Sequence, residues 1–362
     1  MQKKQYIKEN KDLKCTLWEF IYENNNKRKK MNNFKKIGLT ALAGSLAAIS
    51  AHAAEMSVSG ASVLTYTKKD GDETTGNPFG MKTNLGFNAS GEVNGYTVSY
   101  MQTSADQFAG MSSARLSVDM GDLGLIAFDQ GSGSGLSTID DKTPTAAEEI
   151  WDGLDAKGHG GLVGTAGSAG VFNYVNTFAG ITLNAAARKG DGTSSSDGGV
   201  GGTTSGSKGA YDFALTAGED VLMTPGLSAG LGYGENNSGE QINTGTDDEH
   251  MTVFANYAYG AATMGAQLSR KDNGRVSGVN QEAHAWGIAY NINDDLSVSY
   301  GERDVEYEKN GAAHVTEKGS GIAAAYTMGS IKIAGNMNRA KNNQGTKGST
   351  DKMTEIAVSF AF

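Results

Sequence analysis

The chain has 362 residues, with 51 glycines, three prolines, one cysteine and a formal net charge of −9. This acidic balance excludes nucleic acid as a partner, because binding to phosphate backbones needs a basic surface. The single cysteine, Cys15, lies in the first 53 residues, so the rest of the chain is expected to hold no disulfide.

The start of the chain reads as an export signal. Residues 31–53 (MNNFKKIGLTALAGSLAAISAHA) combine two lysines, a short apolar stretch and the small-residue motif AHA. This is the pattern of a Sec signal peptide, with cleavage before Ala54. Residues 1–30 are rich in Lys and Asn, and we expect them to be upstream sequence ahead of the true initiator Met31. A genuine N-terminal extension is the alternative.

Removal of residues 1–53 changes the charge of the protein. The remaining chain has 20 basic and 36 acidic residues, a formal net charge of −16. No later stretch approaches the apolar length of a membrane-spanning helix. The sequence therefore predicts an exported, acidic protein without cysteine.

From Ala54 onward, pairs of alternating apolar and polar segments are joined by very short turns. Seven such pairs follow one another, between an opening strand at Met56–Thr67 and a closing strand at Met353–Phe362. The pairs are LGFNAS-GEVNG-YTVSYM, ARLSVDM-GDLG-LIAFD, VFNYVN-TFAG-ITLNAAAR, YDFALTAGEDVLM-TPG-LSAGLGYG, MTVFANY-AYG-AATMGAQLS, HAWGIAY-NINDD-LSVSYGERD and IAAAY-TMGS-IKIAGNMN. Because side chains alternate in a strand, each segment has one apolar face and one small or polar face.

The eight connections between these pairs are long and hydrophilic, whereas the turns within them are tight. An even number of antiparallel strands with this arrangement predicts an all-β transmembrane barrel of about 16 strands over residues 54–362, with its apolar face toward lipid. Six aromatic residues beside the short turns are expected to form a girdle at the membrane interface: Tyr96, Phe178, Tyr257, Tyr259, Tyr290 and Tyr326.

The leader, the GDLGLIAF turn, the TPG turn before LSAGLGYG and the terminal SFAF resemble Gram-negative general porins over the whole of residues 54–362. The resemblance implies an outer-membrane location, a homotrimer in lipid, and a role for Phe362, Phe360 and Val358 as the signal read by the outer-membrane insertion machinery. The small outward residues Gly60 and Ser62 would suit subunit contact.

The resemblance also implies that the third long loop folds into the lumen. Here the loop from Gln130 to Ala169 is the longest of the eight. Its carboxylates would line one side of a constriction: Asp140, Asp141, Glu148, Glu149, Asp152 and Asp155. Solvated loop carboxylates without a pore role are the alternative.

Basic side chains are expected on the facing wall. Strand alternation turns Arg115, Arg188 and Lys332 inward, with Lys82 as a weaker fourth candidate. These residues could instead be buried and paired with Asp119 or Asp212. Opposed charges across a water-filled gap would orient solutes and bias ion choice. The acidic residue Asp129 departs from the family's pattern, so the wall is expected to be less positive than usual.

The pattern does not favour catalysis. The four histidines after residue 53 lie far apart without metal-ligand spacing, and no nucleophile or phosphate-binding motif occurs. No cofactor is expected, although the acidic loops could bind Ca²⁺ weakly.

The predicted function is passive, weakly cation-selective diffusion of small hydrophilic solutes. The alternatives are a substrate-specific outer-membrane channel, a structural or adhesive barrel, and a secreted Ca²⁺-binding solenoid. The solenoid would need nonapeptide repeats, which the sequence lacks.

Overall fold

The computed structural model describes residues 55–104, 110–154, 169–190, 209–237, 247–273, 280–309 and 311–362. The chain divides into two units, Met1–Ala53 and Ala54–Phe362, and every described residue belongs to the second. The predicted leader segments therefore lie outside the described residues.

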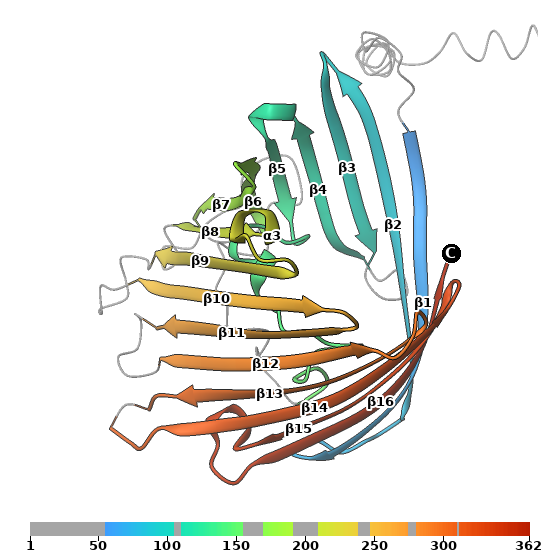
Figure 1. Cartoon of the computed structure of the whole chain (residues 1–362), viewed down its shortest axis with the longest axis vertical. Coiled ribbons are helices and arrows are strands. Elements are labelled where there is room, and N and C mark those ends of the chain that lie inside the picture. The colour runs from blue at the N-terminus through green and yellow to red at the C-terminus, as the bar shows by residue number, and fades with distance from the viewer. Residues whose placement is uncertain are drawn as a thin grey trace, which may run out of the picture. The chain divides into compact units, whose positions relative to one another are not determined.

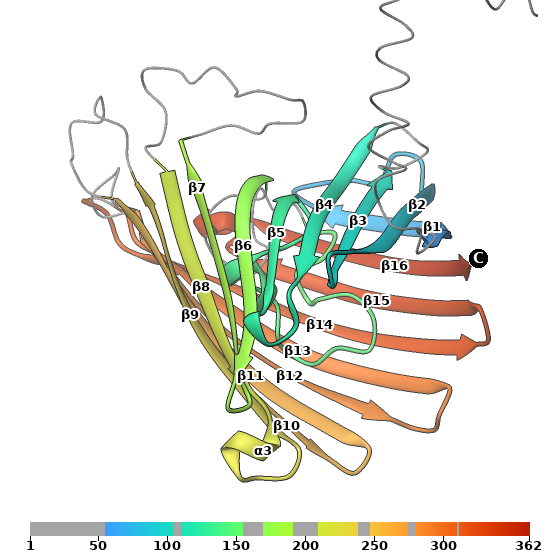
Figure 2. The same ribbon diagram turned by 90° about the horizontal axis from the view of Figure 1, so that it is seen from above.

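Sixteen antiparallel strands pair in chain order, and β1 closes the barrel against β16 (Figures 1 and 2). The strands are β1 (Glu55–Gly71), β2 (Phe79–Val93), β3 (Tyr96–Ser104), β4 (Met111–Asp119), β5 (Leu125–Gln130), β6 (Ala169–Phe178), β7 (Ile181–Lys189), β8 (Gly209–Ala217), β9 (Leu227–Asn237), β10 (Asp248–Tyr259), β11 (Ala262–Asp272), β12 (Gln281–Asn291), β13 (Leu296–Tyr307), β14 (Val315–Met328), β15 (Ile331–Lys341) and β16 (Thr350–Ala361). The predicted 16-strand barrel is confirmed.

Side-chain alternation sorts each strand into an outer and an inner face. On β16, Ile356 and Phe360 are exposed on the outside. Directly before Ile356 in the sequence, Glu355 points inward and accepts a hydrogen bond from Thr67 Oγ1 (2.7 Å). An apolar outer face is stable only against lipid, so the alternation itself marks the membrane-facing surface.

The last residue closes the barrel. Gly60 N donates to Phe362 O (2.9 Å), and Phe362 N donates to Gly60 O (3.0 Å). A Cβ at Gly60 would lie 2.7 Å from the Phe362 ring. Glycine therefore leaves room for the terminal ring beside β1, on the lipid side of the seam.

Short turns join the strands of each hairpin. The β2–β3 turn is Asn94-Gly95, with φ of 53° and 84°. Both residues need a positive φ in this tight hairpin turn, which asparagine and glycine adopt most readily. Near these turns, aromatic side chains such as Phe178, Tyr259 and Tyr290 are exposed on the outer face, as a girdle requires.

One predicted strand is shorter than expected. The alternating pattern of Tyr211–Met223 suggested one segment, but β8 ends at Ala217 and the helical turn α3 (Glu219–Leu222) follows. The Glu219 carboxylate accepts a hydrogen bond from Gly226 N (2.6 Å) and so closes this turn. Carboxylates in the first turn also favour a helix here.

Among the described residues, no helix has the length and apolar character needed to cross a membrane. In the described parts of the connections lie three short 3₁₀ turns: η3 (Gly121–Leu123), η4 (Gly135–Ile139) and η5 (Asn343–Gly345).

Candidate functional site

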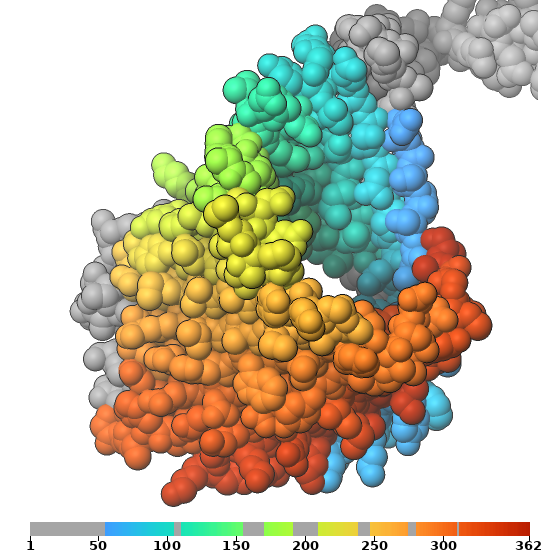
Figure 3. Space-filling view, viewed as in Figure 1, coloured from blue at the N-terminus to red at the C-terminus, as the bar shows by residue number. Residues whose placement is uncertain are grey.

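The candidate site is the barrel interior, which the third long loop enters. This loop, residues 131–168, joins β5 to β6, and its described part ends at Leu154. Figures 1 and 2 show the segment that follows β5 running inside the ring of strands. In the space-filling view, the surface is hollowed between the blue-cyan strands and the yellow-orange strands (Figure 3). A barrel of 16 strands is too wide for its own side chains to fill.

The loop is fastened where it leaves β5. The Asp129 carboxylate, 1% exposed, accepts hydrogen bonds from Ser132 N (2.8 Å), Ser132 Oγ (2.6 Å) and Ser134 Oγ. Asp129 thus holds the first turn of the loop. Its carboxylate is occupied by hydrogen bonds within the loop. That Asp129 makes the wall less positive stays a prediction.

The loop then packs its apolar side chains against the inner wall. Leu136 and Ile139 on η4 are fully buried beside Ala214 and Phe254. A Cβ at Gly232 would lie 2.3 Å from Leu136 Cδ1. The missing side chain at Gly232 therefore makes the recess that holds η4 against β9.

Two amide side chains on the inner wall form hydrogen bonds with the loop backbone at residues 139–142. Gln267 Oε1 accepts from Lys142 N (2.7 Å), and its Nε2 donates to the carbonyls of Ile139 (3.0 Å) and Asp140 (2.8 Å). Asn256 Nδ2 donates to Lys142 O (2.8 Å). A loop inside a barrel lacks strand partners, so its buried backbone groups need such side chains.

The same arrangement continues to the far wall. Ser299 Oγ accepts from Ala146 N (2.9 Å). Asn338 Nδ2 donates to the carbonyls of Glu149 and Asp152, both at 2.9 Å. From β10 to β15, the wall thus supplies polar side chains at intervals along the loop.

A row of glycines gives the loop its path. Four inward positions pair directly from strand to strand across β11–β14: Gly265, Gly287, Gly301 and Gly321. A Cβ at Gly287 would lie 2.6 Å from Pro144 O, and one at Gly301 would lie 3.2 Å from Ile150 Cγ2. Glycine at these positions lets the loop backbone approach the wall more closely than any side chain would permit.

Trp151 ties the loop to a buried ion pair. Its ring lies 4.9 Å from the Arg303 guanidinium carbon, in cation–π geometry. Arg303 Nη2 contacts Glu317 Oε1 at 2.9 Å, and both side chains are almost fully buried. Glu317 Oε2 also accepts from Gln344 N (2.8 Å) in the β15–β16 loop. The third loop and this outer loop therefore share one buried charge network.

Burial changes the acidity of the loop carboxylates. Burial, together with a hydrogen bond that the protonated Asp140 donates to Asp141 and the charge of Asp141, raises the pKa of Asp140 to about 7. Burial and the nearby Asp141 likewise raise the pKa of Glu149 to about 7. Asp140 and Glu149 therefore gain negative charge as the pH rises through neutrality.

Glu148 projects from the loop, and its side chain is exposed to the lumen. Its pKa is raised by burial within the barrel and by the Asp152 charge, and is lowered in part by Lys332 and Lys82. The side chain is accessible to water, but the surrounding barrel and loop still reduce the solvation of its charged form. The charges of Lys332 and Lys82 thus act on the same carboxylate from the facing wall.

The two lysines lie in one row of the sheet. Lys332 on β15 pairs with Ser359, Ser359 pairs with Val63, and Val63 pairs with Lys82 on β2. The charges of both lysines act on Glu148, in the acidic part of the third loop. Glu355, which also raises the pKa of Glu148, adds a carboxylate on the same wall.

Arg115 and Arg188 lie on the inner face but elsewhere. Arg115 Nη1 donates to Gly133 O (3.2 Å), and its Nη2 donates to Asn173 Oδ1, so the side chain braces the start of the loop. Arg188 lies near the outer-loop end of β7. The structure thus brings Lys332 and Lys82 together, and places Arg115 and Arg188 on other strands.

The predicted constriction residue Asp155 and the predicted weak Ca²⁺ binding are not tested by the structure. Asp155 lies outside the described residues. Within the described ranges, no group of three His, Cys, Asp or Glu side chains has an arrangement that could hold a metal ion. Weak Ca²⁺ binding at the acidic loops stays a prediction.

A family model described as Gram-negative porin matches residues 38–362. The curated proteins contain no match to the chain.

Solved structures share the fold at low identity. The anion-selective porin from Comamonas acidovorans is 13% identical, with a TM-score of 0.60 over 85% of this chain and 100% of that chain. The trimer form of OmpT from Vibrio cholerae is 15% identical, with a TM-score of 0.62 over 86% and 100%. The channel DcaP of Acinetobacter baumannii is 16% identical, with a TM-score of 0.60 over 87% and 99%.

The glycine row predicts the effect of one added methyl group. In Gly287→Ala, the new Cβ would meet the Pro144 carbonyl, so the loop must move from the wall, at a cost of about 1–3 kcal/mol. We expect trypsin to cleave after Lys142 several-fold faster than in the unchanged protein. Gly319→Ala is the matched control, because its Cβ would meet the nearest atom at 3.4 Å. Equal cleavage of both variants would show that the row does not hold the loop.

Proposed function

The chain belongs to the Gram-negative porin family, and from that premise we propose that it passes small hydrophilic solutes and ions by passive diffusion, with a weak preference for cations. Its general role is that of an outer-membrane channel for solute diffusion. The observation that supports the finer proposal is the group of carboxylates on the third loop, one of which, Glu148, is influenced by the two wall lysines Lys332 and Lys82.

The charge balance at this level favours cations. Five described loop carboxylates and Glu355 on the wall are opposed by Lys82, Lys142 and Lys332. Fixed charges in a water-filled passage raise the local concentration of the opposite ion. The Comamonas acidovorans porin is described as anion-selective, but 13% identity transfers a fold and no selectivity.

The ion selectivity of the channel should depend on pH. Because the pKa values of Asp140 and Glu149 are raised to about 7, both groups are mainly neutral at pH 6 and mainly charged at pH 8. In planar bilayers with a KCl gradient, the protein should give stepwise conductance, and its preference for K⁺ should rise between pH 6 and pH 8. Anion preference at both pH values would contradict the proposed selectivity, and a folded barrel without conductance would contradict the channel function.

Single charge changes test the two walls separately. Glu148→Gln should lower the K⁺ to Cl⁻ permeability ratio about twofold and Lys332→Gln should raise it about twofold, because one unit charge in water acts on a nearby ion by about 1 kcal/mol or less. Asp122→Asn, in the β4–β5 turn, is the control and should leave the ratio unchanged. Shifts in the same direction for both variants would rule out opposed charges as the source of selectivity.

We also propose assembly as a homotrimer after export through Sec, with Phe362, Phe360 and Val358 read by the insertion machinery. The described trimer form of the Vibrio cholerae protein and the small outward residues Gly60 and Ser62 support this. In native outer membranes, cross-linking should give trimers, and N-terminal sequencing should begin at Ala54. Monomers alone, or an intact residue 31, would contradict the respective part.

A further inference from the structure

The outer loop between β15 and β16 is held on inner-face residues of β13 and β14. Its 3₁₀ turn η5 lies on two of them. Glu317 Oε2 accepts from Gln344 N (2.8 Å), and Lys309 Nζ donates to Gly345 O (2.5 Å). Gly345 has a φ of 67°, and a Cβ there would lie 2.8 Å from Tyr307 Cγ. Glycine therefore lets η5 lie directly on the ring of a buried tyrosine.

The same outer loop is also fastened on its other side. Asp72 Oδ2, in the β1–β2 loop, accepts from Asn343 Nδ2 (3.3 Å) and from Ser349 Oγ. Asn342 Nδ2 donates to Thr316 O at the start of β14 (3.0 Å). The loop thus has a defined position against the wall at the outer end of the barrel.

Glu317 divides its carboxylate between this loop and Arg303. Its Oε1 contacts Arg303 Nη2 (2.9 Å), whereas its Oε2 accepts from Gln344 N and from Tyr307 OH (3.3 Å). Arg303 and Glu317 are each 3% exposed. A buried ion pair is stable only when its remaining polar atoms are also satisfied. The N–H group from η5 therefore helps to keep this ion pair out of water.

Arg303 in turn holds the side chain of Trp151 in the third loop. The Trp151 ring lies 4.9 Å from the Arg303 guanidinium carbon. Cation–π attraction is stronger when the cation is shielded from water. The contact between the third loop and Arg303 therefore depends on burial of the ion pair, which η5 completes.

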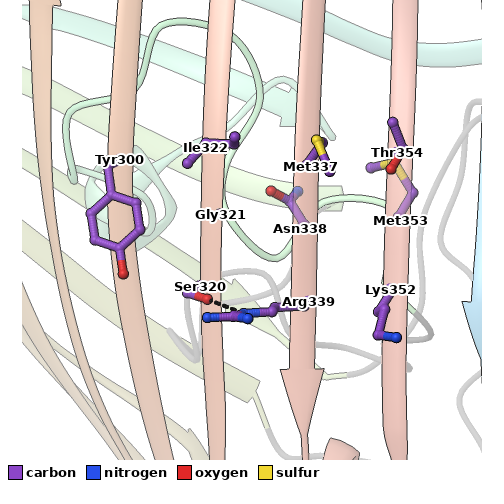
Figure 4. A pocket seen from close by; sticks show the side chains of 10 residues that line it. All are labelled: Tyr300, Ser320, Gly321, Ile322, Met337, Asn338, Arg339, Lys352, Met353 and Thr354. Atoms are coloured by element: carbon purple, nitrogen blue, oxygen red, sulfur yellow. Dashed lines mark hydrogen bonds between the residues drawn. The ribbon is translucent and has the colours of Figure 1, made fainter.

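Trp151 belongs to the acidic turn of the third loop, which we define as residues 148–152. Asp152 N donates to Glu149 O (3.0 Å), and Asn338 Nδ2 donates to both of their carbonyls. Met353, which packs against Leu154, pairs with Asn338 on the neighbouring strand (Figure 4). The backbone of the acidic turn is thus fixed by β15, whereas its tryptophan is held by Arg303.

We propose that Arg303 and Glu317 are positioning residues for the constriction and that η5 completes their site, so that the acidic turn keeps its position only while the outer loop is held on Glu317. The state of the outer loop then controls the charge that a solute meets deeper in the lumen. The coupling passes through three contacts: Gln344 with Glu317, Glu317 with Arg303, and Arg303 with Trp151. It rests on the proposed channel function only for its effect on current.

The coupling is expected to loosen the acidic turn rather than to expel the third loop. Release of η5 would let water reach Glu317 and Arg303, and a hydrated ion pair holds its side chains less firmly. The hydrogen bonds from Asn338 do not depend on the outer loop. Trp151 should therefore become more accessible to water while the barrel and the path of the loop are retained.

Tryptophan fluorescence reports this contact directly. The chain has three tryptophans, so Trp18→Phe/Trp286→Phe leaves Trp151 as the only one. In this background, with protein purified from outer membranes into detergent, Gly345→Ala should raise acrylamide quenching of Trp151 at least twofold. The reason is that the new Cβ would displace η5 from Tyr307 and admit water to the ion pair.

Gly348→Ala is the matched control. Gly348 lies in the same loop with a φ of 85°, but a Cβ there would meet nothing within 4 Å. The control shares the backbone strain of Gly345→Ala without the contact, and it should leave the quenching unchanged.

Glu317→Gln removes the same fastening without a change in the loop. One amide oxygen cannot accept from both Arg303 and Gln344, so quenching should again rise at least twofold. Glu306→Gln, on the outer face of β13, removes one equal charge and should have no effect. All variants should keep the heat-modifiable gel mobility of a folded barrel.

The pH dependence of ion selectivity is a second readout, in planar bilayers. Burial raises the pKa of Glu149 to about 7, so a loosened and hydrated turn lets this pKa fall toward its usual value. Glu149 would then be charged already at pH 6. The increase in K⁺ preference between pH 6 and pH 8 should shrink to about half in Gly345→Ala, because Asp140 still titrates there.

The possible results separate the coupling from the channel function. Unchanged quenching in both Gly345→Ala and Glu317→Gln would overturn the coupling, as would equal quenching in Gly345→Ala and Gly348→Ala. Raised quenching with an unchanged pH dependence would overturn the positioning role in selectivity. Absence of conductance in the unchanged protein would contradict the channel function alone, since the fluorescence comparison needs no current.

Discussion

The need to pair every backbone polar group in a medium without water governs this structure. In hydrocarbon, an unpaired N–H or C=O costs several kcal/mol, so a sheet must have no edge. The chain meets this constraint by pairing β1 with β16, up to the two hydrogen bonds between Gly60 and Phe362. Closure of 16 strands then fixes two consequences: an apolar outer face and a lumen that side chains alone do not fill.

The same constraint reappears inside the lumen in another form. The third loop crosses the inner wall, and its backbone groups lose part of their contact with water. The inner wall supplies hydrogen-bond partners for a loop N–H or C=O group from four side chains: Gln267, Asn256, Ser299 and Asn338. The glycine row supplies the space, and these side chains supply the partners. The inner wall thus acts toward the loop as a neighbouring strand would.

Much of the barrel could be predicted from period-two alternation, since it fixes both strand identity and the face of each side chain. It turned Arg115, Arg188 and Lys332 inward, as the structure has them. Alternation alone does not give the register between strands. Lys82 and Lys332 are 250 positions apart in sequence, and only the pairing through Ser359 and Val63 brings them into one row.

The loop fastenings were missed for a related reason. Gly265, Gly287, Gly301 and Gly321 look like ordinary small inward residues until the register aligns them. Asn338 and Gln267 look like solvated wall residues until the path of the loop is known. In the sequence, the position of the loop on the wall is indicated only by inward Gly, Asn and Gln residues on consecutive strands. It becomes specific only once the strands are aligned, because the barrel's tilt displaces each glycine by a different number of residues from its turn.

Alternation also makes adjacent residues independent in function. On β15, Asn338 bonds the third loop, while Arg339 lies on the outer face and donates to Ser320 Oγ. On β16, Met353 packs with Leu154 of the loop while Lys352 faces outward beside Arg339. One strand therefore serves the aqueous lumen and the lipid surface through neighbouring side chains. A register shift of a single residue would exchange the two sets, so the requirements of both faces together hold each strand in place.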